Sequence, residues 1–179
     1  MGEVILTMKG IDKSFPGVHA LDHVDLEVRK GEVLALMGEN GAGKSTLMKI
    51  LGGIYTKDAG SILINGREVQ IHNVADARDN GISIIHQELM LARHMTIAEN
   101  VFMGREQKRA GGFVDLARQE AETQRFLDHY GIKLKADTRL DRLTIAQQQM
   151  VEIIRAVSFG SRIIVMDEPT SSLSDAEVD

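Results

Sequence analysis

One glycine-rich stretch decides the fold of this chain: Gly38-Glu39-Asn40-Gly41-Ala42-Gly43-Lys44-Ser45. It satisfies the P-loop pattern in full, and it lies between an apolar run at residues 33–37 and a segment expected to be helical. Glycines allow successive backbone N–H groups to turn inward around a phosphate, and the N-terminus of the following helix adds a partial positive charge. The alternative is a chance glycine-rich turn, which the expected strand and helix on either side disfavour. The stretch therefore predicts a phosphate-binding loop.

Two side chains after the glycines supply the rest of the expected chemistry. Lys44 can reach the β- and γ-phosphates of a nucleotide, which makes it a candidate catalytic residue, and the Ser45 hydroxyl can ligate Mg²⁺. We therefore expect ATP and Mg²⁺ to bind at residues 38–46, a range that ends at Thr46.

A second polar cluster follows the apolar run at residues 163–166. Asp167 ends that run, as expected for a carboxylate that holds Mg²⁺ through water. Glu168 comes next, and alternation along an extended chain points it away from Asp167. Glu168 is thus our candidate for polarising the attacking water. Alone, the pair would be interpreted as an exposed acidic turn before Pro169, but its combination with the P-loop favours the functional interpretation.

Strand and helix signals fall into three segments, and with the P-loop between a strand and a helix they are typical of an α/β fold. Residues 1–80 are expected to form short strands punctuated by glycine, with one helix after the glycine-rich loop. The expected strands include residues 33–37, 61–64, 81–86 and 162–166, and the second of these ends at a hairpin-turn signal, Asn65-Gly66.

The segment from about residue 88 to residue 158 is expected to be mostly helical. Thr96 opens a capping box with Glu99. Asp115 is expected to cap a helix over 116–130 that Gly131 stops, and Thr144 to cap a helix over 146–158. The best candidate for a loop or hinge is Gly111-Gly112.

Composition narrows the function classes. The chain has 179 residues, of which 43% are hydrophobic and 26% charged, as in one ordinary globular domain. Its net charge is -5 and no long basic block is present, which counts against a nucleic-acid partner. Cysteine is absent, so disulfides and thiolate metal sites are excluded. No apolar run is long enough to span a bilayer and the first residues do not resemble a secretory signal, so we expect any membrane role to require a partner.

The acidic cluster and its neighbours resemble the ATP-binding cassette (ABC) family. Residues 167–173 look like that family's Walker B motif and D-loop, and the helical segment lies where the family has its helical subdomain. Gln87 matches the Q-loop glutamine, which in the family contacts Mg²⁺ and the attacking water, and Phe15 lies where an aromatic residue stacks on adenine. A lone glutamine would otherwise be a surface residue and a lone phenylalanine a core residue.

The resemblance implies a P-loop NTPase core, with a parallel sheet flanked by helices, an N-terminal antiparallel β subdomain and an α-helical insertion. It divides a single ABC domain into a nucleotide-binding core with the β subdomain (1–87), a helical subdomain with the signature (88–158), and the Walker B and D-loop segment (159–179).

A narrower resemblance is to the first ATPase domain of ribose- and galactose-type sugar importers. It rests on stretches that run through nearly the whole chain, including residues 13–21, 38–43, 87–89, 98–105 and 148–153. It implies ATP hydrolysis coupled to monosaccharide import at the cytoplasmic face of the inner membrane, to which the protein would be peripheral. The implied partners are transmembrane permease subunits, a second ABC domain and, indirectly, a periplasmic sugar-binding protein. Two alternatives stay open: a soluble ABC-type ATPase acting on ribosomes or nucleic acid, and a non-hydrolysing ATP-binding fragment.

Two departures from the family pattern stand out. The signature, normally Leu-Ser-Gly-Gly-Gln, is here Leu143-Thr144-Ile145-Ala146-Gln147, so side chains replace the two glycines that would approach a partner's nucleotide. The family's switch histidine should follow the D-loop, but the sequence ends at Asp179. We therefore expect asymmetric sites, and a C-terminally truncated chain that binds ATP and hydrolyses it poorly.

Overall fold

The computed structural model describes residues 2–39, 41–85 and 90–166, which form parts of two compact units, residues 1–83 and 84–179. Each unit is described by itself. The predicted division at residues 87 and 158 stays a prediction.

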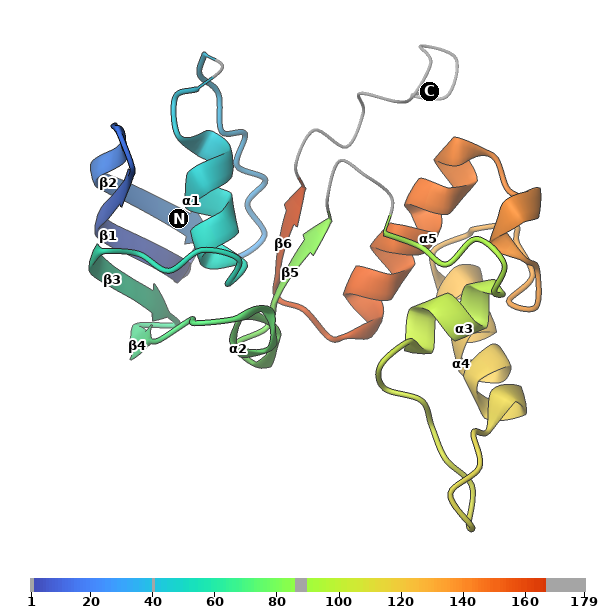
Figure 1. Cartoon of the computed structure of the whole chain (residues 1–179). Helices are drawn as coiled ribbons and strands as arrows, with labels where there is room; N and C mark the ends of the chain where they lie inside the picture. The colour runs from blue at the N-terminus through green and yellow to red at the C-terminus, as the bar shows by residue number, and fades with distance from the viewer. Residues whose placement is uncertain (1, 40, 86–89, 167–179) are drawn as a thin grey trace. The chain divides into compact units, whose positions relative to one another are not determined.

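The first unit is built on a four-stranded antiparallel sheet with the order β2-β1-β3-β4 (Figure 1). The strands are β1 (Val4–Phe15), β2 (Val18–Arg29), β3 (Ala59–Ile64) and β4 (Arg67–Val69). Leu6 and Met8 of β1 pair with Ile64 and Ile62 of β3, and three of these four side chains are almost fully buried. The N-terminal antiparallel sheet is thus confirmed.

Two details of the expected strands differ from the structure. β1 and β2 have 12 residues each, so the expectation of short strands is wrong for this hairpin. The expected turn is confirmed, because Asn65 and Gly66 join β3 to β4 with positive φ angles of 50° and 75°.

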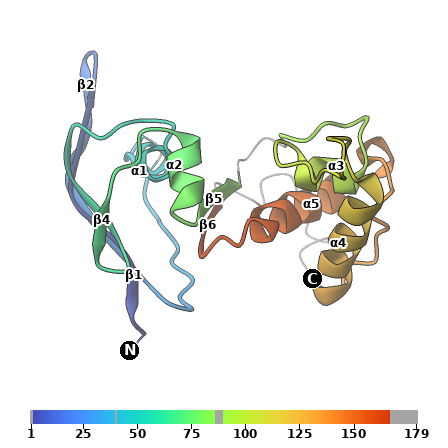
Figure 2. The ribbon, with the colours of Figure 1, turned by 90° about the horizontal axis from the view of Figure 1, so that it is seen from below.

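Two helices of the first unit lie on the same side of this sheet (Figure 2). The helix predicted after the glycine-rich loop is α1 (Lys44–Leu51), which buries Leu47, Ile50 and Leu51. A second helix, α2 (Val74–Asp79), was not expected; Asn73 caps it by accepting a hydrogen bond from the N–H of Asp76. Gly53 makes the packing of the two helices possible, since a Cβ at that residue would lie 2.1 Å from the carbonyl oxygen of Asn73.

The prediction of a strand at residues 33–37 is wrong. These residues belong to no strand, and their side chains are exposed, to 98% at Val33 and 89% at Met37. The physical reason is that an apolar run becomes a strand only where a neighbouring strand satisfies its N–H and C=O groups, and no described strand pairs with it.

The second unit has a helical core. Its helices are α3 (Ile97–Phe102), α4 (Leu116–His129) and α5 (Ile145–Ser158), with a short 3₁₀ helix η1 (Leu140–Arg142) before α5. Their buried side chains form one hydrophobic cluster: Ile97, Ala98, Val101, Phe102, Leu127, Ala136, Leu140, Val151 and Ile154. The strand β5 (Ile82–Ile85), whose last two residues open this unit, pairs with β6 (Ile163–Met166), so both predicted strands are confirmed.

The predicted helix ends are also confirmed. Thr96 accepts from the N–H of Glu99, whose carboxylate accepts from the N–H of Thr96. Asp115 accepts from the N–H of Arg118 at the start of α4, and Gly131 follows that helix with a φ of 69°.

Candidate nucleotide-binding site

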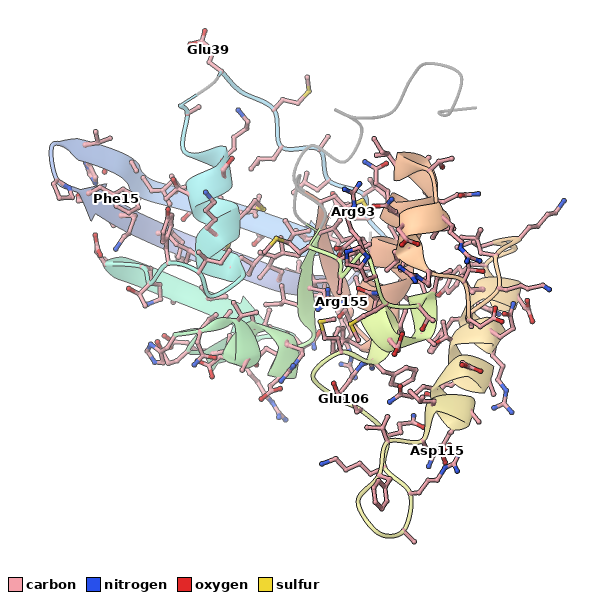
Figure 3. The ribbon with its side chains drawn as sticks, turned by 45° about the vertical axis from the view of Figure 1, so that its right-hand side comes forward. Phe15, Glu39, Arg93, Glu106, Asp115 and Arg155 are labelled. Atoms are coloured by element: carbon pink, nitrogen blue, oxygen red, sulfur yellow. The ribbon has the colours of Figure 1, made fainter. Side chains whose placement is uncertain are left out.

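The glycine-rich loop has the backbone that the sequence pattern requires. Gly41 and Gly43 have φ angles of 89° and 84°, in the left-handed region where a side chain would be strained. The N–H of Ala42 donates to the carbonyl oxygen of Glu39 at 3.1 Å, which closes a tight turn. Glu39 lies at the outer end of the loop that leads into α1 (Figure 3). Residues 38, 39 and 41–46 therefore come together as one loop and helix start, while Asn40 lies outside the described residues.

The Lys44 side chain extends back along this loop. Its Nζ donates to the carbonyl oxygens of Gly38 at 2.6 Å and Glu39 at 2.9 Å. The ammonium is thus directed at the position where glycine conformations and a helix N-terminus favour an anion.

Gly43 connects the loop to the sheet. A Cβ at this position would lie 2.6 Å from the carbonyl oxygen of Ala20 and 2.7 Å from Cδ2 of Leu21, both in β2. Only glycine allows α1 to start so close to β2, and the N–H of Leu47 then bonds to the carbonyl oxygen of Gly43 at 2.9 Å. The sheet thereby fixes the direction of the helix N-terminus.

The predicted metal and catalytic residues are only partly described. Ser45 is exposed in the first turn of α1, where its hydroxyl can reach a cation, and Thr46 beside it is half-buried. Gln87, Asp167 and Glu168 lie outside the described residues.

Phe15 is half-buried at the end of β1 and has an aromatic partner that the sequence analysis missed. Its ring meets the edge of Tyr55 at a centroid distance of 5.2 Å, and Lys13 Nζ lies 5.5 Å from its centroid. Lys13 Nζ also donates to Asp58 Oδ1 at 2.7 Å, and this hydrogen bond holds the pKa of Asp58 below its ordinary value. The hairpin end around Phe15 (Figure 3) is therefore a small aromatic and charged surface.

The residues predicted to form the signature lie at the start of α5. Thr144 Oγ1 accepts from the N–H of Gln147 at 3.2 Å, and Gln147 Oε1 accepts from the N–H of Thr144 at 3.0 Å. Thr144 is therefore the helix cap, as predicted, and Gln147 completes a capping box. Ile145 is 51% exposed and Ala146 half-buried, so apolar side chains stand at a helix start where the family pattern has glycines.

The segment after residue 89 is held by side chains that sequence reasoning did not single out. The N–H of Met90 donates to Glu152 Oε1 at 3.0 Å, and Arg155 Nη1 donates to the Met90 carbonyl oxygen at 3.3 Å. From α3, the buried Asn100 side chain accepts from the N–H of Ala92 and donates to the Ala92 carbonyl. Glu152 and Asn100 could have been identified from the sequence, because each is a polar residue at a helix position that faces the core.

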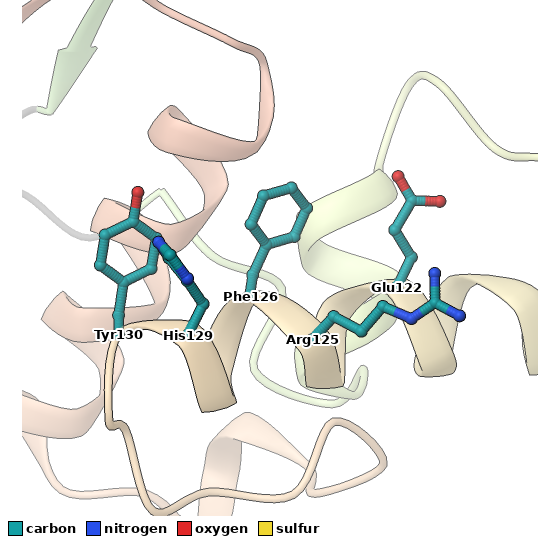
Figure 4. Close-up of a pocket in the computed structure, with 5 residues that line it drawn as sticks. All are labelled: Glu122, Arg125, Phe126, His129 and Tyr130. Atoms are coloured by element: carbon teal, nitrogen blue, oxygen red, sulfur yellow. The ribbon is translucent and has the colours of Figure 1, made fainter.

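A shallow pocket on the outer face of α4 contains none of the predicted site residues. Figure 4 shows the side chains that line it: Glu122, Arg125, Phe126, His129 and Tyr130. Phe126 also packs against the helical core, so the pocket is a surface depression above it.

Comparison with protein families shows which family has this sequence pattern. The sequence profile of the ABC transporter family matches residues 21–171. The chain belongs to the ABC transporter family.

As an ABC transporter chain it has curated relatives of high identity, which extend well beyond it in length. A protein of Albidiferax ferrireducens, whose name describes a ribose/galactose/methyl galactoside import ATP-binding protein, is 52% identical over 98% of this chain and 35% of its own length. The galactose/methyl galactoside import ATP-binding protein MglA of Escherichia coli is 49% identical over 99% of this chain and 35% of its own length. The chain thus spans about a third of these relatives.

Solved structures of ABC transporter cassettes have the same fold. A crystal structure of an ATP-binding cassette in its ADP conformation superposes with a TM-score of 0.84 at 26% identity, over 98% of this chain and 72% of that one. A nucleotide-free cassette gives a TM-score of 0.82 at 27% identity, over 98% and 73%. The P-loop NTPase fold with its helical insertion is confirmed. Within the described residues, none of the helices combines the length and the apolar character needed to cross a bilayer.

Proposed function

We propose that this chain is part of an ATPase subunit that binds Mg²⁺-ATP and couples its hydrolysis to import of a monosaccharide through a membrane permease. The observation that carries the proposal is an identity of 49–52% across 98–99% of the chain with proteins named for galactose and ribose import. The glycine-rich loop supports the nucleotide-binding half of it.

The residues of this loop fit a triphosphate. Left-handed glycines leave the backbone free to turn its N–H groups toward an anion, and the Lys44 ammonium already lies along the loop. Bound phosphate would replace two neutral carbonyl acceptors of Lys44 with charged oxygens. The bonds of the ammonium to carbonyl oxygens join an ion to a dipole, whereas bonds to phosphate join two opposite charges, so this exchange favours binding.

Mg²⁺ is proposed to be held by Ser45, Gln87 and Asp167. All three offer oxygen atoms, the ligands that Mg²⁺ prefers. The exposed Ser45 hydroxyl at the start of α1 fits this role. When bound, the ion neutralises charge that develops on the phosphates. Glu168 is proposed to orient the attacking water, and Phe15 to stack on adenine.

The partners follow from the same proposal. Residues 87–105 are proposed to dock on permease subunits, which would place the protein at the cytoplasmic face of the inner membrane. Thr144, Ile145, Ala146 and Gln147 are proposed to face the nucleotide of a second ABC domain. The sugar-binding protein in the periplasm would act through the permease alone.

The test is reconstitution of the full-length protein with the permease and sugar-binding protein of its own transport system. In proteoliposomes, radiolabelled galactose or ribose should accumulate only when ATP is supplied, and Lys44→Ala should reduce uptake while Lys49→Ala on the same helix leaves it intact. ATP turnover that responds to nucleic acid and not to the permease and sugar would instead favour the ABC proteins that act on ribosomes or DNA.

A further inference from the structure

The end of the β1–β2 hairpin contains two irregularities that gather polar side chains. Ile11 pairs with Val24 and Lys13 with Leu21, so the single residue Asp12 faces two residues of β2, Asp22 and His23. The next pair joins Ser14 to His19, which leaves Ala20 as a second extra residue of β2. Extra residues of this kind bend a strand and change the direction of its side chains.

His23 has an unusual backbone at this site. Its φ of 49° lies in the left-handed region, which histidine adopts more readily than most residues. In a regular strand, neighbouring residues such as Asp22 and His23 would point to opposite faces of the sheet. Here both approach Asp12, because the bulge interrupts the alternation.

Nitrogen and oxygen atoms of these residues lie close together in pairs. His19 Nε2 lies 2.8 Å from Asp12 Oδ1, and His23 Nδ1 lies 3.3 Å from Asp12 Oδ2 and 2.8 Å from Asp22 Oδ1. The coordinating atoms of Asp12, His19 and Asp22 all lie within 4.8 Å of one another. Lys13 does not compete for Asp12, since its ammonium is bound to Asp58.

We propose that Asp12, His19, Asp22 and His23 form a binding site for a divalent transition-metal ion, and that Zn²⁺ fits its donor atoms best. Two imidazole nitrogens and two carboxylates suit Zn²⁺, whereas Mg²⁺ and Ca²⁺ prefer oxygen alone. With Zn²⁺–N bonds of about 2.0–2.1 Å, tetrahedral ligands lie about 3.3 Å apart. The two His–carboxylate separations of 2.8 Å, His19 to Asp12 and His23 to Asp22, would have to open by roughly half an ångström, whereas that of 3.3 Å, His23 to Asp12, already fits.

Protons compete with the metal at this site. Hydrogen bonds to Asp12 and Asp22 raise the pKa of His19 and of His23, respectively, above the ordinary value. An imidazole must be neutral to ligate a metal, so metal binding has to displace these protons. The side chain of Asp12 is 18% exposed while His19, Asp22 and His23 are more open, which gives a hydrated ion access.

The test is calorimetric titration of Zn²⁺ into the tag-free protein at pH 7.5, without nucleotide. We expect one ion per chain, and affinity should fall by at least about tenfold in His19→Gln and in His23→Gln. His72→Gln, which changes an exposed histidine outside the cluster, is the matched control. Lys44→Ala should bind Zn²⁺ as the parent does, which separates this site from the proposed nucleotide site.

A second measurement needs no variant. Substoichiometric Co²⁺ should perturb the imidazole NMR signals of two histidines in the unaltered protein before the other four, and the visible absorption should change from that of the hydrated ion. Absence of Zn²⁺ binding, equal affinity for Mg²⁺, or affinity that survives both histidine substitutions would overturn the proposal.

Discussion

The Lys44 ammonium lies 2.6 Å from the carbonyl oxygen of Gly38, so the lysine is held over the loop from which it projects. The proposed phosphate contact therefore requires a short movement of the ammonium and no rearrangement of α1.

Substitution of Lys44 tests the nucleotide site directly. Loss of a charge-assisted contact costs about 1.5–3 kcal/mol, so Lys44→Ala should weaken ATP binding roughly ten- to hundredfold in calorimetry. Lys49→Ala is the control. Lys49 belongs to the same helix as Lys44, but its ammonium lies over the Tyr55 ring, 5.6 Å from the ring centroid. Equal ATP affinity in the parent and in Lys44→Ala would remove the central proposal.

Two glycines of the loop should respond differently to alanine. At Gly41 a Cβ meets nothing within 4 Å, so Gly41→Ala should cost only the left-handed backbone strain, about 1–2 kcal/mol. At Gly43 the added carbon would also clash with Ala20 and Leu21, so Gly43→Ala should destabilise the protein considerably more. Urea unfolding followed by circular dichroism measures both, and equal losses would contradict the close packing of α1 against β2.

The cap of α5 is a third test. Thr144→Ala removes the acceptor for the Gln147 N–H and should lower the free energy of unfolding by about 1 kcal/mol. Thr144→Ser keeps the hydroxyl and should change stability little. If the serine variant is as unstable as the alanine variant, the methyl group and not the cap is responsible.

Caps could be predicted from the sequence because they are local. Thr96 and Thr144 each bond to a residue three positions along the chain, so short motifs contain the whole interaction. The strand predicted at residues 33–37 failed because its hydrogen-bond partners are not encoded in the run itself. The length of β2 was missed because its extra residues break the alternation of apolar side chains. Glu152 was missed as a contact of Met90 because the two are 62 positions apart.

Crosslinking tests the proposed permease contact. The chain contains no cysteine, so Met90→Cys and His94→Cys would each introduce a single thiol on the exposed part of residues 90–95. Met95 is a poorer choice because it is half-buried. Both thiols should crosslink to cytoplasmic loops of the permease, whereas Tyr130→Cys, at the end of α4, should not. Crosslinks from Tyr130→Cys alone would show that the proposed docking segment is wrong.

Hydrolysis should require Glu168 together with groups from outside the 179 residues. Removal of one donor that stabilises a transition state typically costs about 10²–10³ in rate. In the full-length protein, Glu168→Gln should therefore spare ATP binding and slow phosphate release. The 179-residue chain alone should bind ATP and turn it over far more slowly than the full-length protein. Equal turnover by both, abolished by Glu168→Gln, would show that residues 1–179 contain a complete catalytic site.

The exposed run at residues 33–37 has a consequence for how the isolated chain behaves at the bench. Five consecutive exposed residues, including Val33, Leu34, Leu36 and Met37, form an apolar stretch through which copies of the chain can associate. The apparent molar mass from light scattering should therefore rise with protein concentration at temperatures well below the melting transition. Colloidal stability, more than thermal stability, will set the concentration at which this chain can be studied.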